Sequence, residues 1–153
     1  LDWVLMPGLS LDMFLTGASP FMGKLGKIVA SEDFNLYDDG AARGLPSSKS
    51  ITDEGLPTGH TDLIREGKLS GLLSDYYNYQ RILHAPTGKV KLGTDPTNSL
   101  DSIAPRSGFR PGNGGGRNFA ATPRAVPTNL TIKRPQFRVI HGQISQATLL
   151  SLK

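Results

Sequence analysis

A segment of twenty-one residues limits what the first half of this chain can become. The segment, "DDGAARGLPSSKSITDEGLPT" from Asp38 to Thr58, holds four acidic residues and two prolines. Proline cannot donate to a helix or a sheet ladder, and glycine weakens both, so we predict a loop of about twenty residues. In a compact domain, a loop this long usually has a functional or an interface role.

The four acids of this loop admit two interpretations, a metal or catalytic cluster and a set of turn-forming residues. They occur as "DDG" at 38–40 and "DEG" at 53–55. This composition is typical of turns in which an Asx side chain accepts a hydrogen bond from the backbone two residues on. We favour turns, because acid–base catalysis needs carboxyl groups with contrasting surroundings, and the sequence shows no such contrast.

Short elements flank the loop. Alternation in "FNLYDD" predicts a strand over 33–38. The pattern of residues 60–75 predicts two short strands joined at Glu66-Gly67. A tight hairpin turn needs positive φ, and a residue followed by glycine can supply it. Asp75 as an N-cap predicts a helix over 75–84, with Tyr76 and Tyr79 at the core edge and Tyr77 exposed.

Elements are also predicted toward the two ends of the chain. Near the start, we predict a turn at Pro7-Gly8 between a short strand and a helix, and a helix over "LDMFL" capped by Ser10. Toward the end, we predict a strand in "NLTIKR" and a C-terminal helix in "ISQATLLSLK".

The composition changes to Gly, Pro, Ser, Thr and Arg over 85–127. Within it, "RSGFRPGNGGGRNFAATPRAVPTN" cannot bury enough apolar surface to order itself, and we take 105–124 as a loop or an insertion. Its glycines do not form a phosphate-binding P-loop, because the required Lys-Ser/Thr is missing. Basic and aromatic residues alternate there as in segments that bind single-stranded nucleic acid, which makes Arg106, Arg110, Arg117 and Arg124 candidates for such a role.

Metal-ligating residues are few. The chain has no cysteine, and its histidines are His60, His84 and His141, far apart in sequence. A zinc site built within this chain alone is not expected, because no two histidines have the spacing that places them on one helical face. His60 begins a predicted strand and could face a substrate groove, whereas His84 suits the C-terminus of its helix.

The net charge of +4 is divided unevenly. Residues 1–76 carry six Lys/Arg against eleven Asp/Glu, and residues 77–153 carry eleven against two. A basic half can attract a phosphate-rich partner, or the two halves can fold together and complement one another; we favour the second interpretation. No apolar run is long enough to cross a membrane, and none has the order of a signal peptide.

Several motifs occur in a recognisable order. "PFMGKLGKIVASEDFNLYDDG", "ITDEGLPTGHTDLIREGKLSGLLSDYYNYQRIL", "PTGKVKLG" and "VPTNLTIKR" together resemble the TldD/PmbA family, whose second member type is called TldE. The resemblance covers most of Ser19 to Arg134. The family pattern includes a "GKLGE" step, a "DDG" strand end, a "DDEGVPT" turn, a hairpin followed by a helix, a "TGN" element and a "TN" strand.

The resemblance implies a mainly β fold with a few short helices (α+β). It would be a barrel-like or sandwich domain of the TldD/PmbA C-terminal type, with residues 1–153 an incomplete fragment of it. It also implies a cytosolic peptidase system, described as a modulator of DNA gyrase. In that system a TldD-type subunit carries zinc and pairs with a TldE-type subunit that does not.

The departures from the family pattern favour the TldE type. TldD-type members carry His-Glu-x-x-x-His before the "GKLGE" step and a downstream Cys, but Val4 to Ser19 holds neither His nor Glu. We therefore expect no cofactor in this chain, zinc in the partner subunit, a homo- or heterodimer with a TldD-type subunit, and a peptide substrate. Two alternatives stay open: a catalytic subunit with ligands outside this chain, and a nucleic-acid-binding module. The expected substrate-lining residues are Asp53, Glu54, Thr58, His60, Pro86, Thr87 and Gly88.

Overall fold

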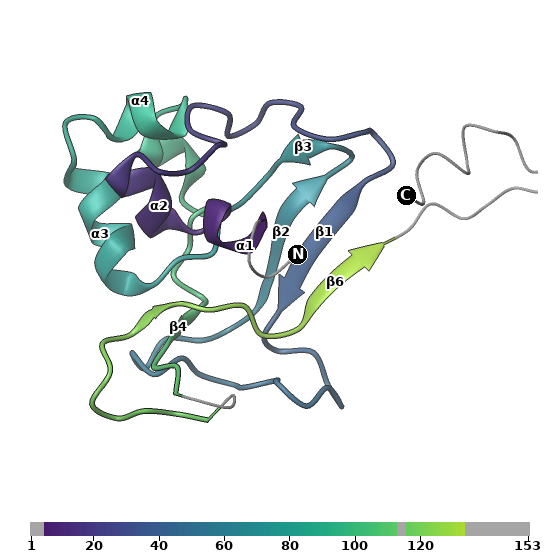
Figure 1. The fold of residues 1–153 in the computed structure, drawn as a ribbon, viewed down its shortest axis with the longest axis vertical. Helices are drawn as coiled ribbons and strands as arrows, with labels where there is room; N and C mark the ends of the chain where they lie inside the picture. Colours follow the sequence, from purple (N-terminus) through teal and green to yellow (C-terminus); the bar gives the residue numbers. More distant parts are fainter. Residues whose placement is uncertain (1–4, 113–115, 134–153) are drawn as a thin grey trace, which may run out of the picture.

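A computed structural model describes residues 5–112 and 116–133 of the chain, and it contains an open antiparallel sheet (Figure 1). The strand order is β3-β2-β1-β6, so β3 and β6 form the edges and the described part of the chain does not close into a barrel. The predicted α+β class is confirmed. The strands are β1 (Asn35–Asp39), β2 (His60–Arg65), β3 (Lys68–Leu69) and β6 (Leu130–Lys133).

Short helices lie to one side of the sheet, and the core fills the space between them (Figure 1). Both layers contribute fully buried side chains to this core. The helices supply Phe14 and Ile82, and the strands supply Leu36 and Leu63. None of the described helices is long and apolar enough to cross a membrane. The helices are α1 (Leu5–Gly8), α2 (Leu11–Thr16), α3 (Tyr76–His84), α4 (Gly88–Leu92) and the 3-10 helix η1 (Pro96–Ser99).

The hairpin of β2 and β3 has the predicted turn. Glu66 and Gly67 have φ values of 50° and 73°, the left-handed conformation that a two-residue hairpin turn requires. The carbonyl of Gly67 accepts hydrogen bonds from the N–H groups of Val29 and Ala30, which ties the turn to the preceding segment. A glycine is needed at 67, because a Cβ there would lie 2.5 Å from the Ala30 oxygen.

Helix α3 is capped as the sequence predicts. The Asp75 carboxylate accepts hydrogen bonds from the backbone N and the side-chain Nδ2 of Asn78, at 2.8 and 2.7 Å. Tyr79 is half-buried against the core and Tyr77 is exposed, as expected. The prediction for Tyr76 is wrong, since this residue is 48% exposed. It occupies the first helical position, where its N–H turns toward Glu54 and its ring toward solvent.

The prediction of a turn at Pro7-Gly8 is also wrong, because both residues lie within α1. The first four N–H groups of a helix have no partner inside it, so Pro7 costs no hydrogen bond there. Ser10 does precede α2 in an extended conformation, but its hydroxyl donates to the Pro7 carbonyl instead of capping the helix.

Two chain segments far apart in sequence, 40–58 and 107–128, form a further part of the molecule. We call residues 40–58, 107–112 and 116–128 the loop lobe; it contains β4 (Gly108–Phe109) and β5 (Arg124–Ala125). Ser107, Gly108 and Phe109 are buried, although the apolar content of their own region was expected to be too low to order it. The order comes from hydrogen bonds to other parts of the chain, such as Asp53 N–H to the Gly108 carbonyl.

The sequence did not predict α4 and η1, which lie within 85–127. The predicted loop at 38–58 is confirmed. The predicted strands at 33–38 and in "NLTIKR" correspond to β1 and β6, so they are confirmed. The predicted C-terminal helix and His141 lie outside the described residues.

Candidate functional site

The acids of the long loop do not gather into one cluster. Asp38 is buried at the end of β1, where its Oδ1 accepts from Thr128 N at 2.8 Å and its Oδ2 from Thr128 Oγ1 at 2.9 Å. Burial raises the pKa of Asp38, although both bonds from Thr128 act in the opposite direction. Only the neighbouring Asp39 makes the predicted Asx turn, accepting from Ala41 N at 3.0 Å.

Asp53 and Glu54 also bind distant residues. The Asp53 carboxylate accepts from Arg110 N at 2.7 Å and forms an ion pair with Arg117 at 3.0 Å. Glu54 Oε2 accepts from Tyr76 N at 2.9 Å, at the first turn of α3. Burial raises the pKa of Glu54, partly offset by the Tyr76 bond. These carboxylates attach the long loop to α3 and to the second half of the loop lobe.

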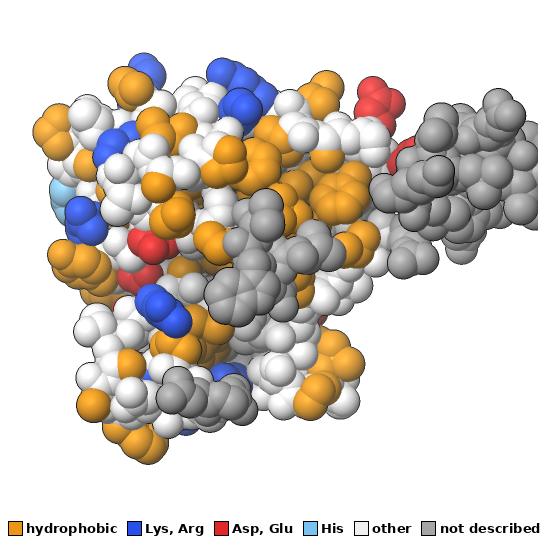
Figure 2. All heavy atoms as spheres, in the orientation of Figure 1, with side chains coloured by type: hydrophobic (Ala, Val, Ile, Leu, Met, Phe, Trp, Pro, Cys, Tyr) orange, Lys and Arg blue, Asp and Glu red, His pale blue; other side chains and the backbone are white. Residues whose placement is uncertain are grey.

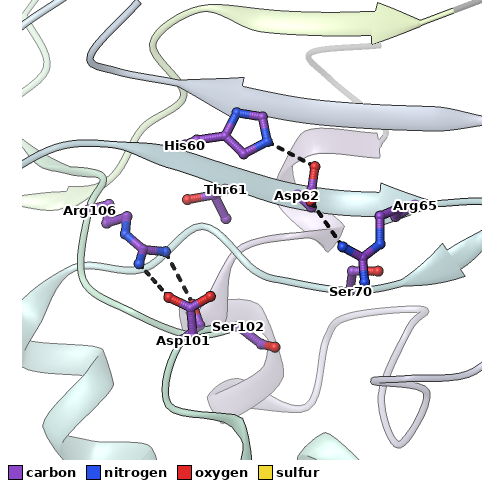
Figure 3. Close-up of a pocket in the computed structure, with 8 residues that line it drawn as sticks. All are labelled: His60, Thr61, Asp62, Arg65, Ser70, Asp101, Ser102 and Arg106. Carbon is purple, nitrogen blue, oxygen red and sulfur yellow. Dashed lines mark hydrogen bonds and ion pairs between the residues drawn. The ribbon is translucent and has the colours of Figure 1, made fainter.

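A polar pocket of about 170 Å³ lies beside β2 (Figure 3). His60 enters it from the start of β2, and its Nε2 lies 2.9 Å from the Asp62 carboxylate. Nδ1 of the same ring lies 3.8 Å from Asp39, and the ring packs on Tyr37 with a centroid distance of 4.8 Å. The lining residues are His60, Thr61, Asp62, Arg65, Ser70, Asp101, Ser102 and Arg106.

The opposite wall of this polar pocket is an ion pair. Arg106 Nη1 donates to the Asp101 carbonyl at 3.2 Å and Nη2 to its carboxylate at 2.5 Å, while Arg65 lies 3.6 Å from Asp62 (Figure 3). The charges of the pocket are thus largely paired with one another. The arrangement offers hydrogen bonds to a polar group but no nucleophile held by a base. Nowhere in residues 5–112 and 116–133 do three His, Cys, Asp or Glu side chains lie close enough to hold a metal ion.

The structure does not bring the expected substrate-lining residues into one site. Asp53 and Glu54 lie near the N-terminus of α3, whereas 86–88 follows its C-terminus. Helix α3, which has nine residues and is about 13 Å long, lies between the two groups. Thr58 donates its hydroxyl to the Lys49 carbonyl, and Gly88 is buried. Substrate lining by these residues stays a prediction.

Three of the four candidate arginines are held by different partners. Arg106 pairs with Asp101 and Arg117 with Asp53, while Arg110 donates from Nη1 to the Phe119 carbonyl at 3.0 Å. The buried Nε of Arg110 has no hydrogen-bond partner among the described residues. Two of the four charges are therefore compensated locally, which weakens a shared phosphate-binding surface.

The sequence interpretation missed the acidic and hydroxyl residues of the polar pocket. Asp62 alternates with His60 along β2, so the period-two pattern could have placed both on one face. Asp101 and Ser102 lie just over forty residues after His60, and no local pattern links them to it.

Comparisons with known proteins identify the class. The family model described as PmbA/TldA metallopeptidase C-terminal domain matches residues 1–150. A curated relative from Haemophilus influenzae, described as Metalloprotease TldD homolog, is 35% identical over 81 residues, which is 53% of this chain and 17% of the relative. The region we describe is therefore of the PmbA/TldA C-terminal type.

A solved structure shares the fold. The crystal structure of TldE from Thermococcus kodakarensis matches 88% of this chain and 25% of TldE, with a TM-score of 0.59 and 24% identity. A Thermotoga maritima structure described as a modulator of a DNA gyrase matches 60% of this chain and 22% of its own, with a TM-score of 0.49 and 26% identity. The chain spans a quarter or less of these relatives. It belongs to the TldD/PmbA family, as the motifs predicted.

Proposed function

We propose that this chain is part of a TldE-like subunit that shapes and guides a peptide in a cytoplasmic zinc peptidase assembly, without holding the metal itself. The observation that carries the proposal is the ligand chemistry: the sequence has no Cys and no His-Glu-x-x-x-His. The described residues do not fit a catalytic zinc, since His60 is engaged with Asp39 of β1 and Asp62 of β2, and His84 ends α3.

The role of the chain is then positional. Peptide hydrolysis would take place on a TldD-type subunit in a homo- or heterodimeric assembly. The carboxylates of Asp38 and Glu54 fix the loop lobe against the sheet and α3. The Asp53 carboxylate joins the two segments of the lobe to each other. A loop held by several long-range bonds keeps one shape, which suits a wall that orients a substrate.

A second candidate is a catalytic subunit whose ligands lie outside this chain. The observation that favours it is the name of the curated relative, Metalloprotease TldD homolog. A nucleic-acid-binding role has less support, because Arg106 and Arg117 already pair with acids. Binding that weakens steeply with salt, and that is lost when all four candidate arginines are changed together, would favour it.

The experiment is peptide hydrolysis by separately purified full-length subunits. We expect no cleavage by the protein that contains this chain alone and cleavage once a TldD-type partner is added. Cleavage by the protein alone that a chelator abolishes would contradict the proposal and establish the second candidate.

A further inference from the structure

A larger cavity lies apart from the polar pocket, between the two N-terminal helices and β5. Its volume is about 560 Å³, in the range of sites that hold a ligand. The apolar residues that line it include Met6, Met13, Leu73 and Val126, and the polar ones include Asp12 and Arg124. We call this cavity the apolar groove. In Figure 2, hydrophobic side chains are visible in the recess between the upper and lower parts of the molecule.

One wall of the apolar groove is the outer edge of β5. Val126 N donates to the Ser107 carbonyl at 2.9 Å, and Gly108 stands opposite Ala125 in the β4–β5 pair. In an antiparallel pair, hydrogen-bonded and non-bonded positions alternate, so Ala125 directs its N–H and C=O away from β4. Ala125 lines the groove. Outside the β4–β5 ladder, its N–H and C=O form no hydrogen bond with another described residue.

Opposite charges stand on the two sides of the groove. Asp12 belongs to α2 and Arg124 to β5, and neither takes part in an ion pair among the described residues. A peptide is the ligand that complements all three features, because it supplies main-chain donors and acceptors, apolar side chains and groups of both charges.

We propose that the apolar groove binds an extended peptide segment alongside β5. The peptide main chain pairs with Ala125, and an apolar side chain rests on the two methionines. An acidic group of the peptide lies at Arg124 and a basic group at Asp12. This proposal rests on the proposed function, since it names where the guiding subunit holds its peptide. Main-chain pairing gives affinity for many sequences, and methionine adapts to side chains of different shape.

The test is fluorescence anisotropy of the full-length protein with labelled Lys-Leu-Val-Leu-Glu and with the same residues in reverse order. Arg124→Glu should weaken binding of the better peptide about tenfold, because attraction becomes repulsion. Replacing the Glu of the peptide by Lys should restore binding to this variant. The matched control is Arg43→Glu, the same charge change at an exposed residue that does not line the groove, which should leave affinity unchanged.

A second peptide series tests the main-chain pairing without changing the protein. Methylating one backbone nitrogen at a time should abolish binding at the position that donates to Ala125 and have little effect at its neighbours. Thermal unfolding of each variant verifies that it is folded. Equal binding by wild type, Arg124→Glu and the methylated series would overturn the groove proposal. The proposed function is tested separately, because hydrolysis by the reconstituted assembly could still be normal in that case.

Discussion

Asp38 and Thr128 are joined by two hydrogen bonds although ninety positions separate them in the chain. Asp38 lies at the end of β1 and is 3% exposed, and its carboxylate connects the sheet to the segment that leads into β6. Asn129 adds a third connection by donating from Nδ2 to the Asp39 carbonyl at 2.8 Å. Together these contacts close the loop lobe onto the sheet.

We expect Asp38→Ala to lower the free energy of unfolding by about 2 to 3 kcal/mol, because it leaves the Thr128 N–H without a buried acceptor. Asp38→Asn should cost less than half as much, since its amide can accept from Thr128 N and donate to Thr128 Oγ1. Urea unfolding of both variants measures the difference. Equal losses for Ala and Asn would contradict the role of these two bonds.

The same carboxylate makes stability depend on pH. Because burial raises the pKa of Asp38, the folded protein binds a proton there more readily than the unfolded chain does. This contribution to the free energy of unfolding is full below the ordinary pKa of 3.8 and is lost as the pH rises through the raised pKa. In a pH series, the stability of wild type relative to Asp38→Asn should therefore fall over that window. If the stability of wild type relative to Asp38→Asn instead rose with pH, the raised pKa of Asp38 would be contradicted.

Asp53→Ala should loosen the second half of the loop lobe. Its carboxylate binds both Arg110 N and the Arg117 side chain, so removing it frees two attachments at once. We expect hydrogen exchange at the Arg110 amide to accelerate about tenfold or more, in line with the loss of a charge-assisted bond. Glu32→Ala, the loss of an exposed acid, is the control and should leave this amide unchanged.

Gly67→Ala should destabilise the protein far more than Gly44→Ala. Both glycines have positive φ, 73° and 80°, so each variant pays about 1 kcal/mol for the left-handed backbone. At Gly67 the new methyl would also meet the carbonyl oxygens of Ala30 and Ser31 at 2.5 and 2.6 Å, whereas nothing lies within 4 Å at Gly44. We expect an additional loss of about 2 kcal/mol or more at 67 in urea unfolding. Similar losses at the two positions would contradict the packing of the hairpin turn against 30–31.

Features set by neighbouring residues were predictable from the sequence. The Glu66-Gly67 turn and the Asp75 cap depend on the conformation or hydrogen bonds of residues at most three positions away, and both are found. The family motifs made the α+β class and the family membership predictable as well.

Features set by distant partners were not predictable in the same way. The carboxylates of Asp38 and Asp53 were interpreted as local turn formers, but they bind residues 90 and 57 positions away. The Gly/Arg-rich region was expected to lack order because its own apolar content is low, yet it is held by acceptors elsewhere in the chain. Helix α4 was hidden by flanking glycines, of which Gly93 ends it with a φ of 85°.

The most direct test of the central claim is the zinc content of the full-length protein, measured by elemental analysis after purification without its partner. We predict far less than one zinc ion per protomer, and close to one per heterodimer once a TldD-type subunit is bound. One zinc ion per protomer in the protein alone would contradict the claim that this subunit guides the peptide without holding the metal.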